Sequence, residues 1–296
     1  MSQRPTWFDL LRCVACQGTL IEEGGAMRCR GCNAGYEITV EGIPVMLTPD
    51  ARETFLFGHD AGPAADLGEE YKGRYRTNLG AQLWRVLSPP HSVYVNPEAP
   101  PLFEAPDGVN LWLGGGGVDT GPFINVDIGA FYGVGLVADA ARLPFADSCC
   151  DRVTCPALLE HVDDPARVVQ EVRRVLKPDG VVEAVVPFCH PYHGYPADYS
   201  RFSKDGLGHL FRDFESIEIG IRTGPATTML TFMTYYGKLL FPVHTGNLVL
   251  RWINRIIMGA FGWISYPLVQ MDRWLNRLPD AHVLANHFWV RARKPG

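Results

Sequence analysis

From Val109 onward the chain alternates short apolar runs with segments of helical periodicity. Parallel strands joined by crossover helices show this alternation, because each strand is buried on both faces and each helix on one. The predicted strands are Val109–Leu113, Phe123–Asp127, Gly135–Ala138, Arg152–Thr154, Gly180–Pro187, Phe214–Arg222 and Phe288–Arg293. The pattern therefore predicts an α/β fold with a doubly wound, mostly parallel sheet of seven strands.

The clearest predicted helix is Pro165–Leu176, where apolar residues recur at the spacing of one buried face. A second helix is expected over about Gly68–Leu87. The predicted divisions are a cysteine-rich module (1–49), a linker with one helix (50–107), the α/β core (108–225), a helical apolar insertion (226–283) and the last strand of the core (284–296).

Two Cys-x-x-Cys pairs, Cys13 with Cys16 and Cys29 with Cys32, stand twelve residues apart near the start of the chain. Four thiolates match the tetrahedral ligand set that zinc prefers, and a site with four protein ligands is structural rather than catalytic. The run MSQRPTWFDLLRC lacks the apolar stretch of a signal peptide, so we expect a cytoplasmic protein, in which such pairs favour metal over disulfides. The plainer alternative is four buried free cysteines.

A glycine run, Gly114-Gly115-Gly116-Gly117, follows the first predicted strand. Glycine permits positive φ and close approach of a ligand to the backbone. Asp127 ends the second strand ten residues later and can accept from both hydroxyls of a ribose, while Asp139 ends the third strand and can accept from an adenine amino group. Parallel strands end at one edge of a sheet, so these groups should converge there. Taken singly, the glycines fit a turn, Asp127 fits a helix cap, and Asp139 fits a turn cap.

Two stretches resemble known families. FDLLRCVACQGTL with MRCRGCNAGYEITVEGIPVMLTPDA, nearly all of residues 7–51, is similar to a small zinc-ribbon family that binds and activates methyltransferases of tRNA, rRNA and release factors. INVDIG, followed by VADAARLPFADSCCDRVTCPALLEHVDDPARVVQEVRRVLKPDGVV, resembles the class I, Rossmann-like methyltransferases of type 11. The two resemblances imply S-adenosylmethionine and a structural Zn²⁺ as cofactors.

Carried over residue by residue, the methyltransferase resemblance and the strand ends give the cofactor-binding candidates Leu113, Gly114, Gly115, Gly116, Asp127, Ile128, Asp139, Ala140, Pro156 and His161. His161 is a neighbour of the cofactor or a structural residue in this interpretation. The sequence departs from the family on the first strand, which reads Asn110-Leu111-Trp112-Leu113 without the acidic residue that commonly precedes the glycines.

The loop after the fifth strand, HPYHGYPADYSRF, concentrates titratable side chains. Methyl transfer needs a nucleophile aligned with the sulfonium, and oxygen or nitrogen acceptors often need a base. His190 and His193 are the candidate bases, and Asp198 is placed to orient either of them. The loop also resembles methyltransferases of cell-surface glycan or lipid-linked biosynthesis. The alternative is an ordered loop whose polar groups satisfy one another.

The insertion contains the apolar run LVLRWINRIIMGAFGWISYPLV, which is nearly long enough to span a bilayer. Arg251, Asn254 and Arg255 interrupt it, and charges are costly at the centre of a bilayer. We therefore expect a lid over the substrate or an element on the inner membrane surface, where Trp and Tyr side chains suit the interface. A buried helical subdomain or a homodimer contact is the alternative.

These patterns predict a methyltransferase that acts on a small-molecule or lipid-linked acceptor. The net charge of −5 disfavours binding to nucleic acid by phosphate neutralisation. An RNA or protein methyltransferase with a fused activator ribbon, and a non-catalytic scaffold, are the alternative functions. The ribbon is predicted as a module of its own. Chelation of zinc should therefore loosen the N-terminal module and leave the main domain folded.

Overall fold

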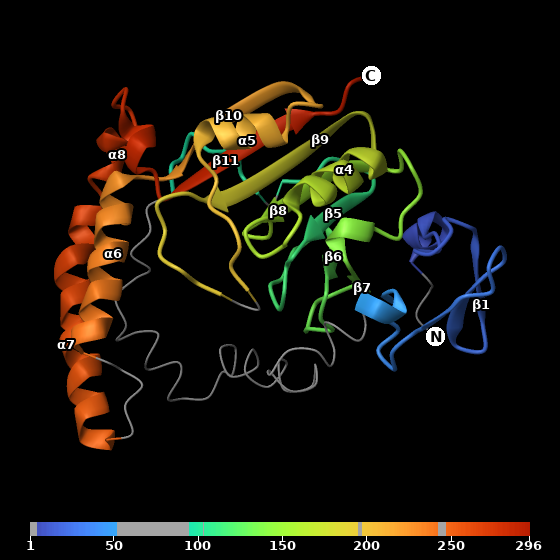
Figure 1. Ribbon diagram of the computed structural model, residues 1–296, viewed down its shortest axis with the longest axis horizontal. Coiled ribbons are helices and arrows are strands. Elements are labelled where there is room, and N and C mark those ends of the chain that lie inside the picture. The colour runs from blue at the N-terminus through green and yellow to red at the C-terminus, as the bar shows by residue number, and fades with distance from the viewer. Residues whose placement is uncertain (1–4, 52–94, 103, 195–196, 242–246) are drawn as a thin grey trace.

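The computed structural model describes residues 5–51, 95–102, 104–194, 197–241 and 247–296 (Figure 1). The helix expected over about Gly68–Leu87 lies outside the described residues. The large sheet contains β4 (Val45–Met46), β5 (Asn110–Leu113), β6 (Ile124–Asp127), β7 (Leu136–Ala138), β8 (Cys150–Pro156), β9 (Leu176–Pro187), β10 (Glu215–Thr223) and β11 (His287–Arg293).

The strand order is β10-β11-β9-β8-β5-β6-β7-β4, and all neighbours are parallel except the two pairs that involve β11. The predicted α/β class with a mostly parallel sheet is confirmed. Within the described residues the sheet has eight strands, one more than the seven predicted. The additional strand is β4, which comes from the residues assigned to the N-terminal module. Val45 and Met46 pair with Val137 and Ala138 and extend the sheet at its edge.

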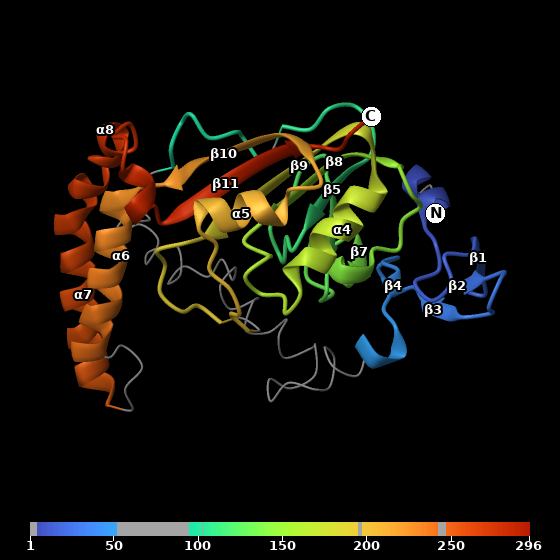
Figure 2. The ribbon, with the colours of Figure 1, turned by 45° about the horizontal axis from the view of Figure 1, so that its top comes forward.

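Two helices of the core, α4 (Pro165–Val175) and α5 (Lys204–Leu210), lie on the same face of the sheet (Figure 2). Helix α4 begins where Asp164 accepts a hydrogen bond from the Arg167 backbone N–H, and it buries Val168, Val169, Val172 and Val175. The segments 114–123 and 128–135, which join β5 to β6 and β6 to β7, contain no helix. These two connections therefore lack the crossover helices of a regular doubly wound sheet, and the glycine run leads into a turn.

The N-terminal module contains the short helix η1 (Thr6–Leu10) and a sheet of three antiparallel strands, β1 (Leu20–Glu23), β2 (Ala26–Cys29) and β3 (Gly35–Glu37). It is joined to the core at two places, because Leu11 bridges to Phe145 while β4 pairs with β7. One continuous apolar core includes Phe8, Leu11, Met27, Tyr36 and Met46 of the module together with Leu113, Leu136, Phe145 and Val153 of the large sheet.

The insertion between β10 and β11 contains the helices α6 (Pro225–Leu240), α7 (Leu248–Val269) and α8 (Asp272–Leu275) and the short helix η3 (Ala281–Leu284). Helices α6 and α7 pack side by side as a hairpin that projects beyond the sheet (Figures 1 and 2). Buried Asp272 fixes its base, since this carboxylate accepts from the backbone N–H groups of Ala226 and Thr227 at the start of α6. Among the described residues, no helix combines the length and the hydropathy needed to cross a membrane.

Candidate functional site

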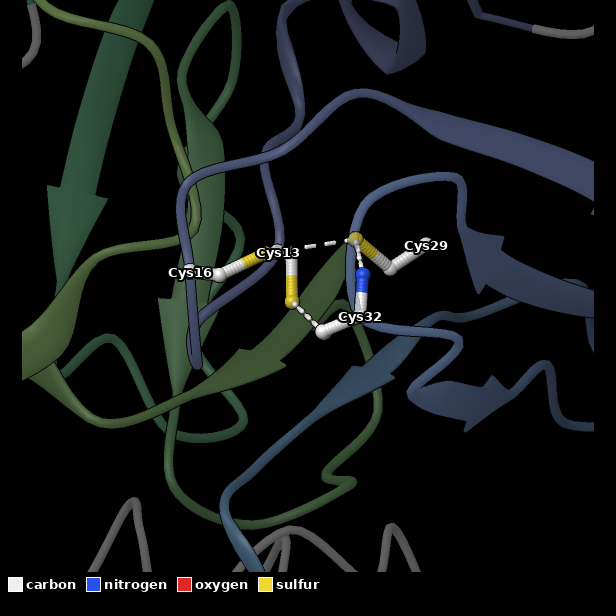
Figure 3. A group of neighbouring side chains, drawn as sticks. All are labelled: Cys13, Cys16, Cys29 and Cys32. Carbon is white, nitrogen blue, oxygen red and sulfur yellow. Dashed lines mark hydrogen bonds between the residues drawn. The ribbon is translucent and has the colours of Figure 1, made fainter.

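The four cysteines of the N-terminal module face one another (Figure 3). Cys13 and Cys16 belong to the loop before β1, while Cys29 ends β2 and Cys32 follows in the next turn. The Sγ atoms of Cys13 and Cys32 are 3.5 Å apart, those of Cys16 and Cys29 are 3.4 Å apart, and all four lie within 4.8 Å of one another. None of the four forms a disulfide.

These distances fit a zinc ion, because a tetrahedron with Zn–S bonds of about 2.3 Å separates its sulfurs by about 3.8 Å. The backbone N–H groups of Gly31 and Cys32 point at the Cys29 Sγ, from 3.3 and 3.5 Å. Such donors stabilise a thiolate, and they help to lower the pKa of Cys29 to about 6, with the contact from Cys32 contributing most. The donor set and its surroundings therefore match a structural zinc site.

The glycine run and Asp127 form one structure at the carboxyl edge of the sheet. The Asp127 Oδ2 accepts from the Gly116 backbone N–H at 2.8 Å, and Oδ1 accepts from the Gly129 N–H at 3.0 Å. Gly114 and Gly116 adopt φ values of +73° and +51°. At Gly115 a Cβ atom would lie 2.3 Å from the Asn125 Oδ1. The backbone is thus held close to a carboxylate, which is the arrangement that a nucleoside ligand requires.

Asp127 is buried, and burial raises the pKa of its carboxyl group, while the N–H donors act in the opposite direction. Each oxygen has a backbone donor, yet a carboxylate has about four acceptor positions in all and keeps capacity for further hydrogen bonds. The plainer interpretation of Asp127 as a helix cap does not apply, because no helix follows β6.

The other predicted cofactor residues lie along the same edge. Asp139 caps the short helix η2 (Ala140–Arg142) by accepting from the Ala141 N–H at 2.8 Å, so its turn-capping role is present. Leu113, Ile128 and Pro156 stand at the ends of β5, β6 and β8. The structure therefore brings the residues that the strand ends predicted to one side of the molecule.

The acceptor loop after β9 is organised around Arg201. Its guanidinium pairs with Asp198 through both carboxylate oxygens, with an Nη2–Oδ2 distance of 2.6 Å, and also donates to the backbone oxygens of His190 and Pro191. The pair with Arg201 holds the pKa of Asp198 well below its usual range. Asp198 also accepts from the His193 backbone N–H, and its Oδ2 is 3.5 Å from the His193 Nδ1. Asp198 therefore lies beside His193 and fixes the loop.

The ring of His190, in the acceptor loop, lies near residues of the same loop, of β11 and of the insertion. Its ring centroid is 4.6 Å from that of His193, 5.1 Å from that of His287 and 6.3 Å from that of Tyr235 on α6. The Nδ1 is 2.8 Å from the Pro191 carbonyl oxygen, which makes Nδ1 the protonated nitrogen and leaves Nε2 to accept a proton. Burial lowers the pKa of His190, so the ring is neutral at pH 7.

Three residues of this site have properties that the sequence does not reveal. Glu160 is fully buried after β8, although glutamate is rarely found without solvent. Ala157 has a φ of +51°, which is uncommon for a residue with a side chain. His287 begins β11, and burial lowers its pKa to about 3. The Glu160-His161 pair is visible in the sequence, but its burial depends on contacts with the distant acceptor loop.

Part of this domain is similar to known proteins. Residues 126–184, from the end of β6 into β9, match the family described as methyltransferase domain. A ubiquinone/menaquinone biosynthesis C-methyltransferase from Desulfotalea psychrophila is 51% identical over 86 residues, covering 27% of this chain and 35% of that protein. A protein of the same name from Acidiphilium cryptum is 40% identical over 85 residues, covering 23% and 33%. The chain spans about a third of the length of these relatives.

Among solved structures, phosphoethanolamine N-methyltransferase 2 of Haemonchus contortus in complex with S-adenosyl-L-methionine is similar at 14% identity and a TM-score of 0.39, over 83% of this chain and 56% of that chain. The family match covers residues 126–184 of the α/β body, which are similar to a methyltransferase domain. The matched segment includes Asp127, Asp139 and the Glu160-His161 pair. The N-terminal module, the acceptor loop and the helical insertion lie outside that segment.

Proposed function

We propose that this chain is an S-adenosylmethionine-dependent methyltransferase that acts on a small-molecule or lipid-linked acceptor. The observation that carries the proposal is the Asp127 carboxylate, which ties the glycine turn after β5 to the turn after β6. Asp127 itself lies in the segment that matches a methyltransferase domain. Such a carboxylate, with acceptor capacity left beyond its two backbone donors, suits a ribose, and the cofactor would supply an electrophilic methyl group.

The residues that would hold the cofactor follow from the order of the strand ends. Gly114, Gly115 and Gly116 would lie against its methionine part, Asp127 would accept from the ribose hydroxyls, and the free capacity of Asp139 would serve the adenine. These roles come to the chain from its family resemblance. The site lacks a first-strand carboxylate, so Asp127 would contribute a larger share of the binding free energy.

His190 is the best candidate for the base. Its Nε2 can accept a proton, and its neutral state at pH 7 keeps that atom available. His193 is the second candidate, and Asp198 would act through it by fixing the backbone of the loop. The acceptor would then lie between the cofactor edge and α6, because His190 faces Tyr235 of that helix.

The hairpin of α6 and α7 supports an acceptor that is linked to a lipid. Both helices expose large apolar side chains, among them Leu239, Val249, Ile256, Ile264 and Trp263. The hairpin also begins beside the acceptor loop, at the end of β10. The two relatives are named for ubiquinone and menaquinone biosynthesis, which is consistent with an apolar acceptor. We infer that the hairpin lies on the inner membrane surface and brings the site to its acceptor.

The cysteine module would hold a structural zinc ion and stabilise the core with which it shares apolar contacts. Transfer of a labelled methyl group tests the whole proposal. The purified protein is incubated with labelled S-adenosylmethionine and an extract of the source organism, which is then divided into lipid, aqueous, nucleic-acid and protein fractions. The label should enter the lipid fraction or the small molecules of the aqueous fraction. Label in RNA or protein would instead support the fused-activator alternative, and transfer to none of the fractions would contradict an active methyltransferase.

A further inference from the structure

A buried carboxylate beside two histidines forms a second cluster of metal-ligand type, separate from the cysteines. Glu160 follows β8 and is 0% exposed, and neither of its carboxylate oxygens has a hydrogen-bond partner among the described residues. Its Oε1 lies 3.8 Å from the His161 Nε2 and 3.6 Å from the His193 Nε2. A potential ligand atom from each of the three residues lies within 4.8 Å of the others. An isolated buried carboxylate is costly unless a positive charge compensates it.

The surrounding carbonyl groups determine which nitrogen of each ring faces Glu160. The His161 Nδ1 is 2.5 Å from the Ala197 carbonyl oxygen, and the His193 Nδ1 is 3.2 Å from the Pro191 carbonyl oxygen. A carbonyl oxygen can only accept, so the His161 Nδ1 carries the hydrogen. The His193 Nδ1 also lies 3.4 Å from the Arg201 Nη2, but the two hydrogens of that nitrogen go to Asp198 and Pro191, so this Nδ1 donates as well. In the neutral ring each Nε2 then presents a lone pair. Two nitrogen lone pairs and a carboxylate therefore converge on one point.

The cations nearby are already engaged. The Arg201 guanidinium uses its donors on Asp198 and on the carbonyl oxygens of His190, Pro191 and Ser200. The positive charge that compensates Glu160 can be of two kinds. It is either a proton on one imidazole or a metal ion between the three lone-pair atoms. Hydrogen bonds from the far ring nitrogen to a carbonyl oxygen, as both Nδ1 atoms make here, commonly orient histidine ligands of a metal.

We propose that Glu160, His161 and His193 bind a divalent transition-metal cation. Two imidazole nitrogens and one carboxylate oxygen suit zinc, cobalt or iron, whereas magnesium and calcium prefer oxygen ligands alone. Three protein ligands leave at least one coordination position for water or for an oxygen of a substrate. The histidine side chains are 15% and 26% exposed, which gives a cation access from the outside while Glu160 stays dry.

The position of this cluster indicates what the cation would do, and this part of the inference rests on the proposed function. Glu160 and His161 follow β8, and His193 belongs to the loop after β9, so the cluster lies between the cofactor edge and the acceptor loop. A cation there would bind an acceptor through a hydroxyl or carbonyl oxygen. In that case His193 is a ligand rather than a base, His161 is a ligand rather than a neighbour of the cofactor, and His190 is the remaining candidate base.

Calorimetric titration of the full chain with CoCl₂ tests the cation site after the four cysteines have been filled with zinc. We expect one further cobalt ion to bind to the wild-type chain. Glu160→Gln and His193→Gln should each weaken that binding by at least about a hundredfold, the upper range for loss of a group that only supports a ligand. His209→Gln changes an exposed histidine on α5 and should leave cobalt binding unchanged.

The result does not depend on enzymatic activity. Zinc analysis and circular dichroism establish that the variants are folded and keep the cysteine site. Failure of the wild-type chain to bind cobalt beyond the zinc of the cysteines would overturn the proposal and leave a proton on His193 as the compensating charge. Equal cobalt affinity in wild type and Glu160→Gln would overturn it as well. Cobalt binding without binding of S-adenosylmethionine would uphold the cation site and contradict the proposed function.

Discussion

Asp127 has a structural role in addition to the ribose-binding role that we propose for it. The spacing of glycines and aspartate predicted a carboxylate at the end of the second strand, where it could meet a ribose. The structure shows that the same carboxylate also holds the glycine turn through the Gly116 and Gly129 N–H groups. Hydrogen bonds of this kind depend on the exact path of a loop, and sequence spacing does not determine that path.

Gly115 is a position where a single methyl group should disturb the site. In Gly115→Ala the new Cβ would lie 2.3 Å from the Asn125 Oδ1, and Asn125 is buried and donates to the Gly116 carbonyl oxygen, so it has little room to move. We expect a loss of about 1–3 kcal/mol in the free energy of unfolding, measured in urea. Asn125→Ala removes the side chain that the new Cβ would meet. Gly115→Ala should therefore lower the free energy of unfolding less in the Asn125→Ala background than in wild type. Wild-type stability in Gly115→Ala would contradict the packing described.

His287 should make the protein sensitive to mild acid. Burial first, and then the charges of His190, His193, Arg201 and Arg222, lower the folded-state pKa of His287 to about 3, whereas an unfolded histidine has a pKa of about 6.5. The unfolded chain therefore takes up a proton that the folded chain does not, so the contribution of His287 is complete above pH 6.5 and is lost as the pH falls toward 3.

The variant His287→Asn keeps a polar group near Thr223 and removes this titration. Between pH 7.5 and pH 5 the free energy of unfolding should fall by about 2 kcal/mol more in wild type than in His287→Asn, as measured by urea denaturation at each pH. An equal fall in both proteins would show that His287 titrates normally in the folded chain.

At the scale of elements, the strands were the most predictable part of the molecule. All seven predicted strands of the α/β core are present, because buried parallel strands produce short apolar runs that are easy to recognise. β4 was not predicted, since two residues give no periodicity and their pairing with β7 is a tertiary contact. The hairpin was predicted as a helical apolar insertion, but its projection from the sheet depends on how the Asp272 carboxylate fixes its base.

The exposed apolar face of this hairpin should bind lipid. Val249, Ile256 and Ile264 are 68%, 65% and 78% exposed, respectively. Replacing Ile256 and Ile264 with Asp should weaken binding to phospholipid vesicles by about tenfold for each residue, since burial of one such side chain contributes about 1.5 kcal/mol or more. Sedimentation with vesicles measures this effect. Val40→Asp, at a side chain of the N-terminal module that is 99% exposed, provides the control. Binding that stays equal in all variants would exclude the hairpin as the lipid contact.

At the scale of the whole molecule, the N-terminal module and the sheet form one structure. The sequence suggested a separate ribbon that could loosen alone, because the cysteine spacing is complete within the first residues of the chain. The structure places Met27, Tyr36 and Met46 in the same apolar core as Leu113 and Phe145. Sharing of a core is a property of packing between distant segments, and no local pattern reveals it.

Zinc removal should therefore destabilise the entire protein. We expect a chelator to lower the melting temperature in one cooperative transition, because the metal stabilises a module whose apolar side chains complete the main core. Circular dichroism and intrinsic fluorescence should report the same midpoint. Cys16→Ser should reproduce the effect without a chelator, and Cys189→Ser, outside the zinc site, should not. Two separate transitions, with the sheet unaffected, would contradict the shared core.

We expect the carboxyl edge of β5, β6 and β7 to bind S-adenosylmethionine through Asp127, and calorimetric titration of the protein with S-adenosylmethionine measures this binding. Wild-type protein should bind one molecule per chain, and Asp127→Asn should weaken the binding by at least about tenfold, since hydrogen bonds to a charged group contribute about 1.5–3 kcal/mol. Asp119→Asn, in an exposed turn of the same connection, should bind like wild type. Absence of binding by the wild-type chain, or equal affinity in Asp127→Asn, would contradict this expectation.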